Sequence, residues 1–140
     1  MNALLPIAAA LQMQSTNAPP PQGDALFIAA TGAWEILSGG PGSEDVSCDT
    51  EPMRIRIEAD SRRYFVRHGD WSDTATILDH GLGWFHIAYD GEARLDRDGG
   101  TVSWYWVYAS PDSFYWVRND WLDTGDRTVM RVRCMNGQVG

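Results

Sequence analysis

The chain of 140 residues contains no lysine. All 11 of its basic residues are arginines, they stand against 14 aspartates and five glutamates, and the formal net charge is −8. Proteins that bind nucleic acid present clustered basic side chains to the phosphates, and no basic run in this sequence could build such a face. An anionic membrane surface is disfavoured for the same reason. We therefore expect neither nucleic acid nor a membrane surface among the partners.

Apolar runs long enough to cross a bilayer, which takes about 20 consecutive apolar residues, are also missing. The longest candidate, MNALLPIAAAL at residues 1–11, is followed by polar residues and by the small Ala18. This order is typical of a secretory signal peptide. We expect residues 1–18 to be a signal peptide and the mature protein to be periplasmic or secreted, without membrane insertion. An apolar helix at an intracellular N-terminus is the alternative, because no basic residue precedes the run and Pro19 would follow the cut.

Patterns of catalytic and metal-binding residues are scarce. His68, His80 and His86 are scattered, and no pair of cysteines lies beside them, so the spacing of a zinc site is missing. No serine stands in the context of a nucleophile elbow. The glycine-rich run at 39–42 lacks the Lys-Ser/Thr that a phosphate-binding loop requires. We expect no metal, no cofactor and no catalytic centre, and hence a protein that acts by binding rather than as an enzyme.

The composition is that of one globular domain, with 44% hydrophobic and 21% charged residues. A proline-rich spacer at 19–23 favours neither a helix nor a sheet. The sequence predicts a barrel domain at 24–135 and a flexible tail at 136–140. The first segment of the domain, 24–31, predicts either two helical turns with Asp24 as the N-cap or a first strand. In both cases we expect this segment to plug one end of the domain.

Strand patterns follow one another from residue 32 onward. Hydrophobic residues alternate with charged ones over 54–60, and 63–68 continues the alternation after a turn. A strand spacing of roughly 8 to 12 residues without helical periodicity is typical of an all-β sandwich or barrel. We expect an all-β antiparallel meander of eight or nine strands that closes into a small barrel, with an open sandwich as the alternative. The remaining strand candidates are 33–38, 74–79, 83–89, 92–97, 101–109, 113–118 and 128–134.

The tripeptide Gly32-Ala33-Trp34, on the first predicted strand, resembles the G-x-W opening of lipocalins and of the wider calycin superfamily. With Thr31 before it, the segment also resembles the T-G-x-W opening of the avidin-like branch. The resemblance implies a calycin-like barrel in which Trp34 closes one end and an arginine of the last strand, Arg131 or Arg133, packs across it. The T-D-Y motif of lipocalins is missing and no biotin-binding residues can be matched. The resemblance therefore bears on the fold more than on the ligand.

Cys48 and Cys134 are the only cysteines, and they flank nearly all of the predicted strands. An even pair in an exported chain predicts one structural disulfide. A strict eight-strand meander, however, puts the start of the second strand and the end of the last strand at opposite ends of the barrel, whereas a disulfide needs Cα atoms within about 7 Å. Three outcomes stay open: the loop at 39–52 folds back along the wall, the strand count is odd, or both cysteines are free.

Eleven of the 16 aromatic residues lie between Trp84 and Trp121, which indicates where a binding site would lie. These rings either line a cavity for a small apolar or aromatic ligand or simply fill a small barrel. The first interpretation gives the function that we expect, non-covalent ligand binding by a lipocalin-like barrel. The candidate ligand-binding residues, on strand faces that we expect to point inward, are Trp84, His86, Trp104, Trp106, Tyr108 and Trp116.

The opposite faces of the same strands are apolar as well. A sheet that is hydrophobic on both sides must cover its outer face, so we expect a protein partner, a second copy of the chain or the segment 26–30 to pack there. The alternative function is therefore a protein-binding barrel, such as a periplasmic hydrolase inhibitor or an assembly partner, that uses this outer face and its loops. The residues predicted for the outer face are Phe85, Ile87, Tyr89, Tyr105, Val107, Tyr115 and Val117.

Overall fold

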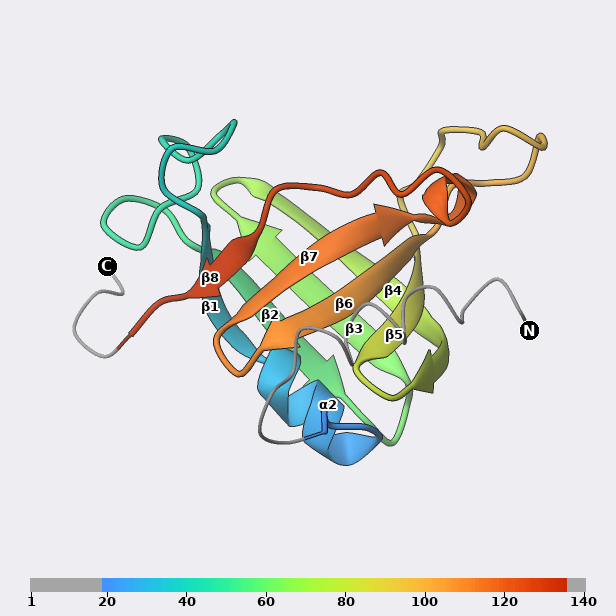
Figure 1. Cartoon of the computed structure of the whole chain (residues 1–140), viewed down its shortest axis with the longest axis horizontal. Helices are drawn as coiled ribbons and strands as arrows, with labels where there is room; N and C mark the ends of the chain where they lie inside the picture. The colour runs from blue at the N-terminus through green and yellow to red at the C-terminus, as the bar shows by residue number, and fades with distance from the viewer. Residues whose placement is uncertain (1–18, 136–140) are drawn as a thin grey trace.

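The computed structural model describes residues 19–135, which form a closed barrel of eight antiparallel strands (Figure 1). Each strand pairs with the next along the chain, and the last strand pairs with the first. The predicted all-β meander and its closure are thereby confirmed. The signal peptide predicted at 1–18 and the tail predicted at 136–140 lie outside the described residues. The elements in chain order are α2 (Asp24–Ala30), β1 (Gly32–Ile36), β2 (Met53–Glu58), β3 (Arg63–His68), β4 (Trp71–Gly81), β5 (Trp84–Tyr89), β6 (Trp104–Ser110), β7 (Ser113–Arg118), the 3-10 helix η2 (Asn119–Trp121) and β8 (Arg131–Arg133).

Two of the strands, β3 and β7, begin and end at the residues that the sequence predicts. The possible ninth strand at 92–97 does not form. Asp96 instead accepts hydrogen bonds from the backbone N–H groups of Asp98 and Gly100, at 2.9 Å each, and thereby folds this segment into a turn. The barrel therefore has eight strands rather than nine.

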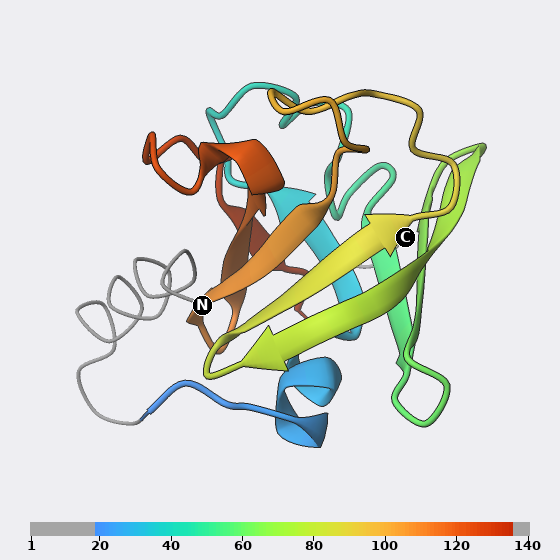
Figure 2. The ribbon, with the colours of Figure 1, turned by 90° about the vertical axis from the view of Figure 1, so that its right-hand side faces the viewer.

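The segment after the spacer is a helix, α2, which is the first of the two predicted alternatives. The N-cap is Gly23 rather than Asp24, because the chain enters the helix with a positive φ of 60° that glycine adopts without strain. Leu26, Phe27 and Ala30 join the core inside the barrel, so α2 plugs one end (Figure 2). Packing of the segment 26–30 on the outer face, one of the three covers that the sequence left open, does not occur, because the apolar side of α2 is used at the barrel end. No helix described in residues 19–135 has the length and apolar character to span a bilayer.

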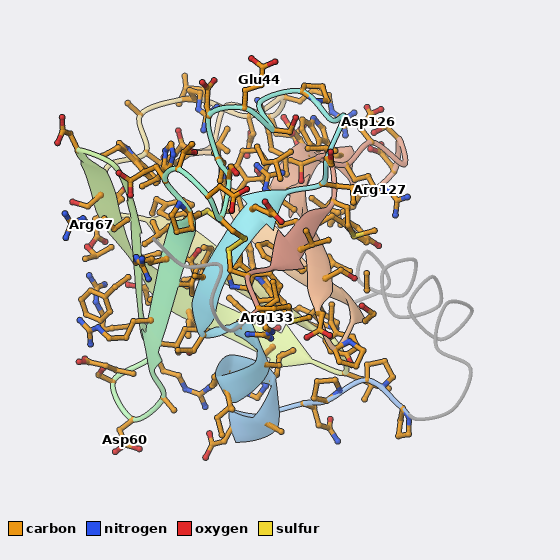
Figure 3. The ribbon with its side chains drawn as sticks, turned by 90° about the vertical axis from the view of Figure 1, so that its left-hand side faces the viewer. Glu44, Asp60, Arg67, Asp126, Arg127 and Arg133 are labelled. Atoms are coloured by element: carbon orange, nitrogen blue, oxygen red, sulfur yellow. A yellow bond between two sulfur atoms is a disulfide. The ribbon has the colours of Figure 1, made fainter. Side chains whose placement is uncertain are left out.

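Trp34 and Arg133 close the barrel at the α2 end. Trp34 is 1% exposed, and its indole N–H donates a hydrogen bond to the carbonyl of Ala30 at 3.0 Å. The guanidinium of Arg133 lies 4.3 Å from the centroid of the Trp34 ring and donates to the carbonyls of Ala29 and Thr31. A cation at the C-terminal end of a helix satisfies carbonyls that have no partner within the helix. Figure 3 shows Arg133 where β8 passes above α2.

Aromatic side chains fill the half of the barrel next to α2. The ring of Trp106 stacks between Phe85 and Phe114, with centroids 5.1 and 4.7 Å away. Trp34 meets Phe114 edge to face at 4.8 Å. Rings packed at these distances are typical of a protein interior and leave no room for a ligand between them. Of the two interpretations of the aromatic residues, filling of the barrel therefore applies to the half next to α2.

Cys48 and Cys134 form a disulfide, with their Cα atoms 5.6 Å apart. Of the three outcomes left open by the sequence, the first applies, because the loop between β1 and β2 folds back along β1. In this loop the carbonyl of Val46 accepts a hydrogen bond from the N–H of Ile36 at 3.0 Å. The N–H of Cys48 donates to the carboxylate of Glu35 at 3.2 Å. These bonds bring Cys48 beside β1 and hence beside the end of β8.

Candidate functional site

The end of the barrel away from α2 forms a cup with a cavity volume of about 410 Å³. Side chains at the ends of four successive strands line it: His68 of β3, Trp71 of β4, Tyr89 of β5 and Trp104 of β6. The loops that follow β1, β5 and β7 rise around this end of the molecule (Figure 2). The meander therefore brings residues from most of the chain to one concave surface.

Aromatic rings form much of the wall of the cup. Trp116 and Tyr89 lie deep, with ring centroids 6.5 Å apart. Trp71 packs against Tyr89 at 6.4 Å and is 52% exposed, which places it at the rim. Trp104 meets Trp121 edge to face at 5.5 Å. Such a wall suits a flat apolar molecule, because each ring offers a face or an edge for contact.

A pair of phenols lies below the cup. The hydroxyl of Tyr89 donates a hydrogen bond to the hydroxyl of Tyr64 at 3.4 Å, and Tyr64 is fully buried. Burial raises the pKa of both phenols above the ordinary value of 10.0, because the low-polarity interior disfavours the phenolate. Both hydroxyls are therefore neutral at physiological pH.

The guanidinium of Arg131 lines the cup and has no carboxylate partner among the described residues. One of its Nη atoms donates to the carbonyl of Val129 at 2.8 Å, whereas its Nε is buried without a hydrogen-bond partner in the part of the chain that the structure describes. Burial lowers the pKa of Arg131 from its ordinary value, but a guanidinium still keeps its charge at physiological pH. Of the two arginines that the resemblance offers for packing across Trp34, Arg133 does so and Arg131 lines the cup instead. It lies two residues, about 7 Å along the strand, from Arg133 on the same face, toward the open end.

Glu92 and Arg94 form an ion pair at the rim of the cup, with 2.8 Å between Nε of Arg94 and the carboxylate. The indole N–H of Trp104 donates to the same carboxylate at 3.3 Å. Hydrogen bonds from Arg94 stabilise the charged form and lower the pKa of Glu92 to about 2. Arg94 thus neutralises the charge of Glu92, and the Glu92 carboxylate holds the ring of Trp104 in place on the wall.

Of the six residues predicted to bind a ligand, the structure brings Trp104 and Trp116 together in the cup. Trp106 lies in the filled half, where both of its faces are covered by rings. Tyr108 lies opposite Phe114 near the α2 end. Trp106 and Tyr108 therefore point inward as expected but lie outside the lining of the cup.

The expectation that Trp84 and His86 point into the barrel is wrong. The inward residues of β5 are Phe85, Ile87 and Tyr89, which the sequence predicts for the outer face. The two faces of this strand are both apolar, so alternation alone cannot tell which one is buried inside. The ring of Phe85 packs against Trp106 in the core, and this packing fixes the orientation of β5.

On the outer face, His86 pairs with a serine. Its Nε2 lies 2.6 Å from the hydroxyl oxygen of Ser103, and its ring stacks on Tyr105 at 4.1 Å. Burial lowers the pKa of His86, so the imidazole is neutral at physiological pH. Asp79 lies opposite His86 in the strand pairing, but its carboxylate accepts a hydrogen bond from the N–H of His80. The contact between His86 and Ser103 therefore gives each of these two side chains a hydrogen-bond partner, and it lies outside the cup. In residues 19–135, no three His, Cys, Asp or Glu side chains gather as metal ligands.

A second apolar cluster lies outside the barrel, over β5, β6 and β7. Trp121 and Leu122, which follow β7, and Met130, which precedes β8, pack against this cluster. The C-terminal part of the chain, rather than the segment 26–30, therefore contributes to its cover. The buried members of this outer cluster are Trp84, Tyr105, Val107, Tyr115 and Val117.

Sequence reasoning missed several residues of the cup. Tyr89 belongs to the alternation that starts at Phe85, and a correct choice of the inner face of β5 would have found it. Arg131 and Arg133 share a strand face, so only one of them could lie at the closed end, and the other had to point toward the opposite end. Trp71 begins β4 directly after a turn, and nothing in the local sequence marks it as a rim residue.

Comparisons with known proteins add little to this description. The sequence matches no protein-family model, and no curated protein sequence matches it. Among solved structures, the fold is similar to that of Tp0751 (pallilysin) from Treponema pallidum, with a TM-score of 0.44 and 8% sequence identity over 92% of this chain and 95% of that chain. At this level of similarity, the comparison assigns neither a family nor a function.

Proposed function

We propose that the protein is an exported, calycin-like barrel that binds a small apolar or aromatic ligand in the cup, by non-covalent contacts and without catalysing a reaction. The observation that carries this proposal is the cavity of about 410 Å³ between Trp71, Tyr89, Trp104 and Trp116. Small-molecule sites are concave and mostly apolar, contain a few placed polar groups and occupy about 300 to 1,000 Å³. The cup agrees with this description in volume and in composition.

The division of the barrel interior also supports the proposal. The half next to α2 is filled and gives the cup a rigid floor, whereas the open half keeps its space. Neighbouring groups hold the rings of the wall, since Glu92 and Trp121 contact Trp104 and Tyr64 contacts Tyr89. A wall that is already ordered loses little conformational entropy when a ligand binds.

A fluorescence titration with phenylnaphthylamine, an uncharged aromatic probe, tests this proposal. We expect the wild-type protein to bind the probe, with a blue shift of the probe emission. Trp71→Ala should weaken binding several-fold, because it removes a ring from the rim while the half-exposed position leaves the core intact. Leu78→Ala is the matched control, since Leu78 lies on the same strand, is 54% exposed and is not part of the cup lining. No binding by the wild type, or equal losses in both variants, would contradict the proposal.

The disulfide supports the proposed export, because disulfides persist mainly in oxidising compartments. The intact mass of protein purified from an exporting host, recorded with and without reductant, tests it. We expect a chain that has lost residues 1–18 and gains the mass of two hydrogen atoms on reduction of its one disulfide. An uncut chain with two free thiols would contradict both export and the bond.

A second candidate function is binding of a protein such as a periplasmic hydrolase or an assembly partner, or of a second copy of this chain, at the outer cluster over β5, β6 and β7. The five members of this cluster are buried in the folded chain, so a partner would reach them only if the residues that pack over them, such as Trp121, Leu122 and Met130, moved aside. Sedimentation velocity over a range of concentrations tests the homodimer. We expect self-association that Tyr105→Ser or Tyr115→Ser weakens, and a wild-type protein that stays monomeric throughout would contradict the homodimer.

A further inference from the structure

Arg131 stands out among the polar groups of the cup. Six other arginines each contact a carboxylate within 3.3 Å. Arg131 is half-buried and donates to one backbone carbonyl, that of Val129, and its buried Nε has no partner in residues 19–135. A guanidinium offers five N–H donors in a planar fork. Arg131, which lines the cup, therefore has more N–H donors than the acceptors that residues 19–135 give it.

We infer that the ligand of the cup carries a carboxylate on a flat apolar body, and that Arg131 binds this carboxylate. The inference rests on the proposed function, because it names the chemical class of the molecule that the cup would hold. Arginine is suited to this task because its fork matches the two oxygens of a carboxylate in a bidentate pair. The rings of Trp104, Trp116 and Tyr89 would then contact the apolar body of the same molecule.

The acidic side chains of the cup do not supply the missing partner. Glu92 is paired with Arg94 and also accepts the indole N–H of Trp104. Asp73 accepts hydrogen bonds from the backbone N–H groups of Thr74 and Gly91. Both carboxylates therefore have donors of their own, and neither makes an ion pair with Arg131.

The phenols near Arg131 do not neutralise it either. Tyr64 and Tyr89 are close enough for their charged forms to interact with the guanidinium, but burial raises the pKa of both, and they stay protonated. A partly desolvated cation without a counter-ion is unfavourable, and an incoming carboxylate relieves this cost. The same carboxylate placed in an aromatic cup without Arg131 would lose its hydration without compensation.

Calorimetric titrations of the wild-type protein with naphthoate and with naphthamide, its neutral isostere, test the inference. We expect naphthoate to bind at least about tenfold more tightly, which corresponds to a charge-assisted hydrogen-bonded pair. This preference should fall strongly in Arg131→Gln. Arg67→Gln, which removes the same charge from an exposed position of β3 outside the cup lining, should keep the preference.

The outcomes separate the two proposals. If the wild type binds both compounds equally, or if folded Arg131→Gln keeps the preference, the inference is wrong while the proposed cup function stands. If neither compound binds and phenylnaphthylamine also fails, the proposed function itself fails. If Arg131→Gln does not fold, the comparison of naphthoate with naphthamide in the wild type still shows whether the cup prefers a carboxylate. Arg131→Lys then adds a second test, because it keeps the charge, loses the bidentate fork and should reduce the preference.

Discussion

Replacing both cysteines, as Cys48→Ala with Cys134→Ala, tests how much the barrel depends on its disulfide. The bond joins residues 86 apart in the sequence, and a closed loop of this length lowers the entropy of the unfolded chain by an amount worth about 4–5 kcal/mol. Both side chains are buried, so the smaller alanines add a further loss of packing. Because small domains unfold with a free energy of only about 5–15 kcal/mol, we expect the double variant to lose a large fraction of its stability.

Urea denaturation followed by tryptophan fluorescence measures this loss. The variant should still fold into the same barrel, because the strand pairing between β1 and β8 does not involve the two cysteines. The loop between β1 and β2 carries Val46 of the cup lining and would lose its covalent anchor, so the affinity for phenylnaphthylamine should also fall. A decrease of less than about 1 kcal/mol in the free energy of unfolding would refute the reasoning, since the loop would then be held by its hydrogen bonds alone.

Three further predictions concern buried and charged groups. Because the pKa of Glu92 is lowered from 4.5 to about 2, the contribution of this carboxylate to the stability of the fold is fully present above pH 4.5 and is lost as the pH falls toward 2. Over this pH range, thermal melts should show a loss of about 1–2 kcal/mol in the free energy of unfolding, a range that allows for solvent screening at the exposed Arg94. The variant Glu92→Gln should not show this loss. Burial raises the pKa of Tyr64 and Tyr89 above 10.0, so stability should be lost as the pH rises beyond 10. An absorbance titration checks this, because two of the five phenols should ionise only as the chain unfolds; ionisation of all five at pH 10 without unfolding would contradict it. Arg133→Met removes hydrogen bonds to carbonyls and the cation over an indole ring, and thermal denaturation should show a loss of about 2–4 kcal/mol. An unchanged melting temperature would show that the closure by Arg133 contributes little.

The sequence was sufficient to predict the fold because its strands carry strong local signals. The alternation over Met53–Glu58 and Arg63–His68 and the turn between them predict a hairpin that the structure contains. The shortest strand, β8, was predicted too long, at 128–134. Near its start, the N–H of Trp116 donates to the hydroxyl of Thr128 instead of to a backbone carbonyl, while the N–H of Thr128 still donates to the carbonyl of Trp116. Such a local substitution of a side chain for a backbone group leaves no trace in the hydrophobic pattern.

The candidate site was harder to predict, because β5, β6 and β7 are apolar on both faces. The inner face was chosen correctly for β6 and β7, as Trp106 and Phe114 show, and incorrectly for β5, where Phe85 rather than Trp84 lies inside. Only packing against residues distant in the sequence decides between such faces. The position of Arg131 likewise depends on the register of β8 against β1, which the sequence alone does not determine.

Site-resolved NMR of the tryptophan indole N–H groups tests most directly whether a small apolar or aromatic ligand enters the cup. On titration with phenylnaphthylamine, we predict that the indole signals of Trp71 and Trp104 shift, because their rings line the cup. The signals of Trp106, in the filled half, and of Trp84, in the outer cluster, should change least. Shifts confined to Trp84, or no shifts at any concentration of the probe, would contradict binding of the ligand in the cup.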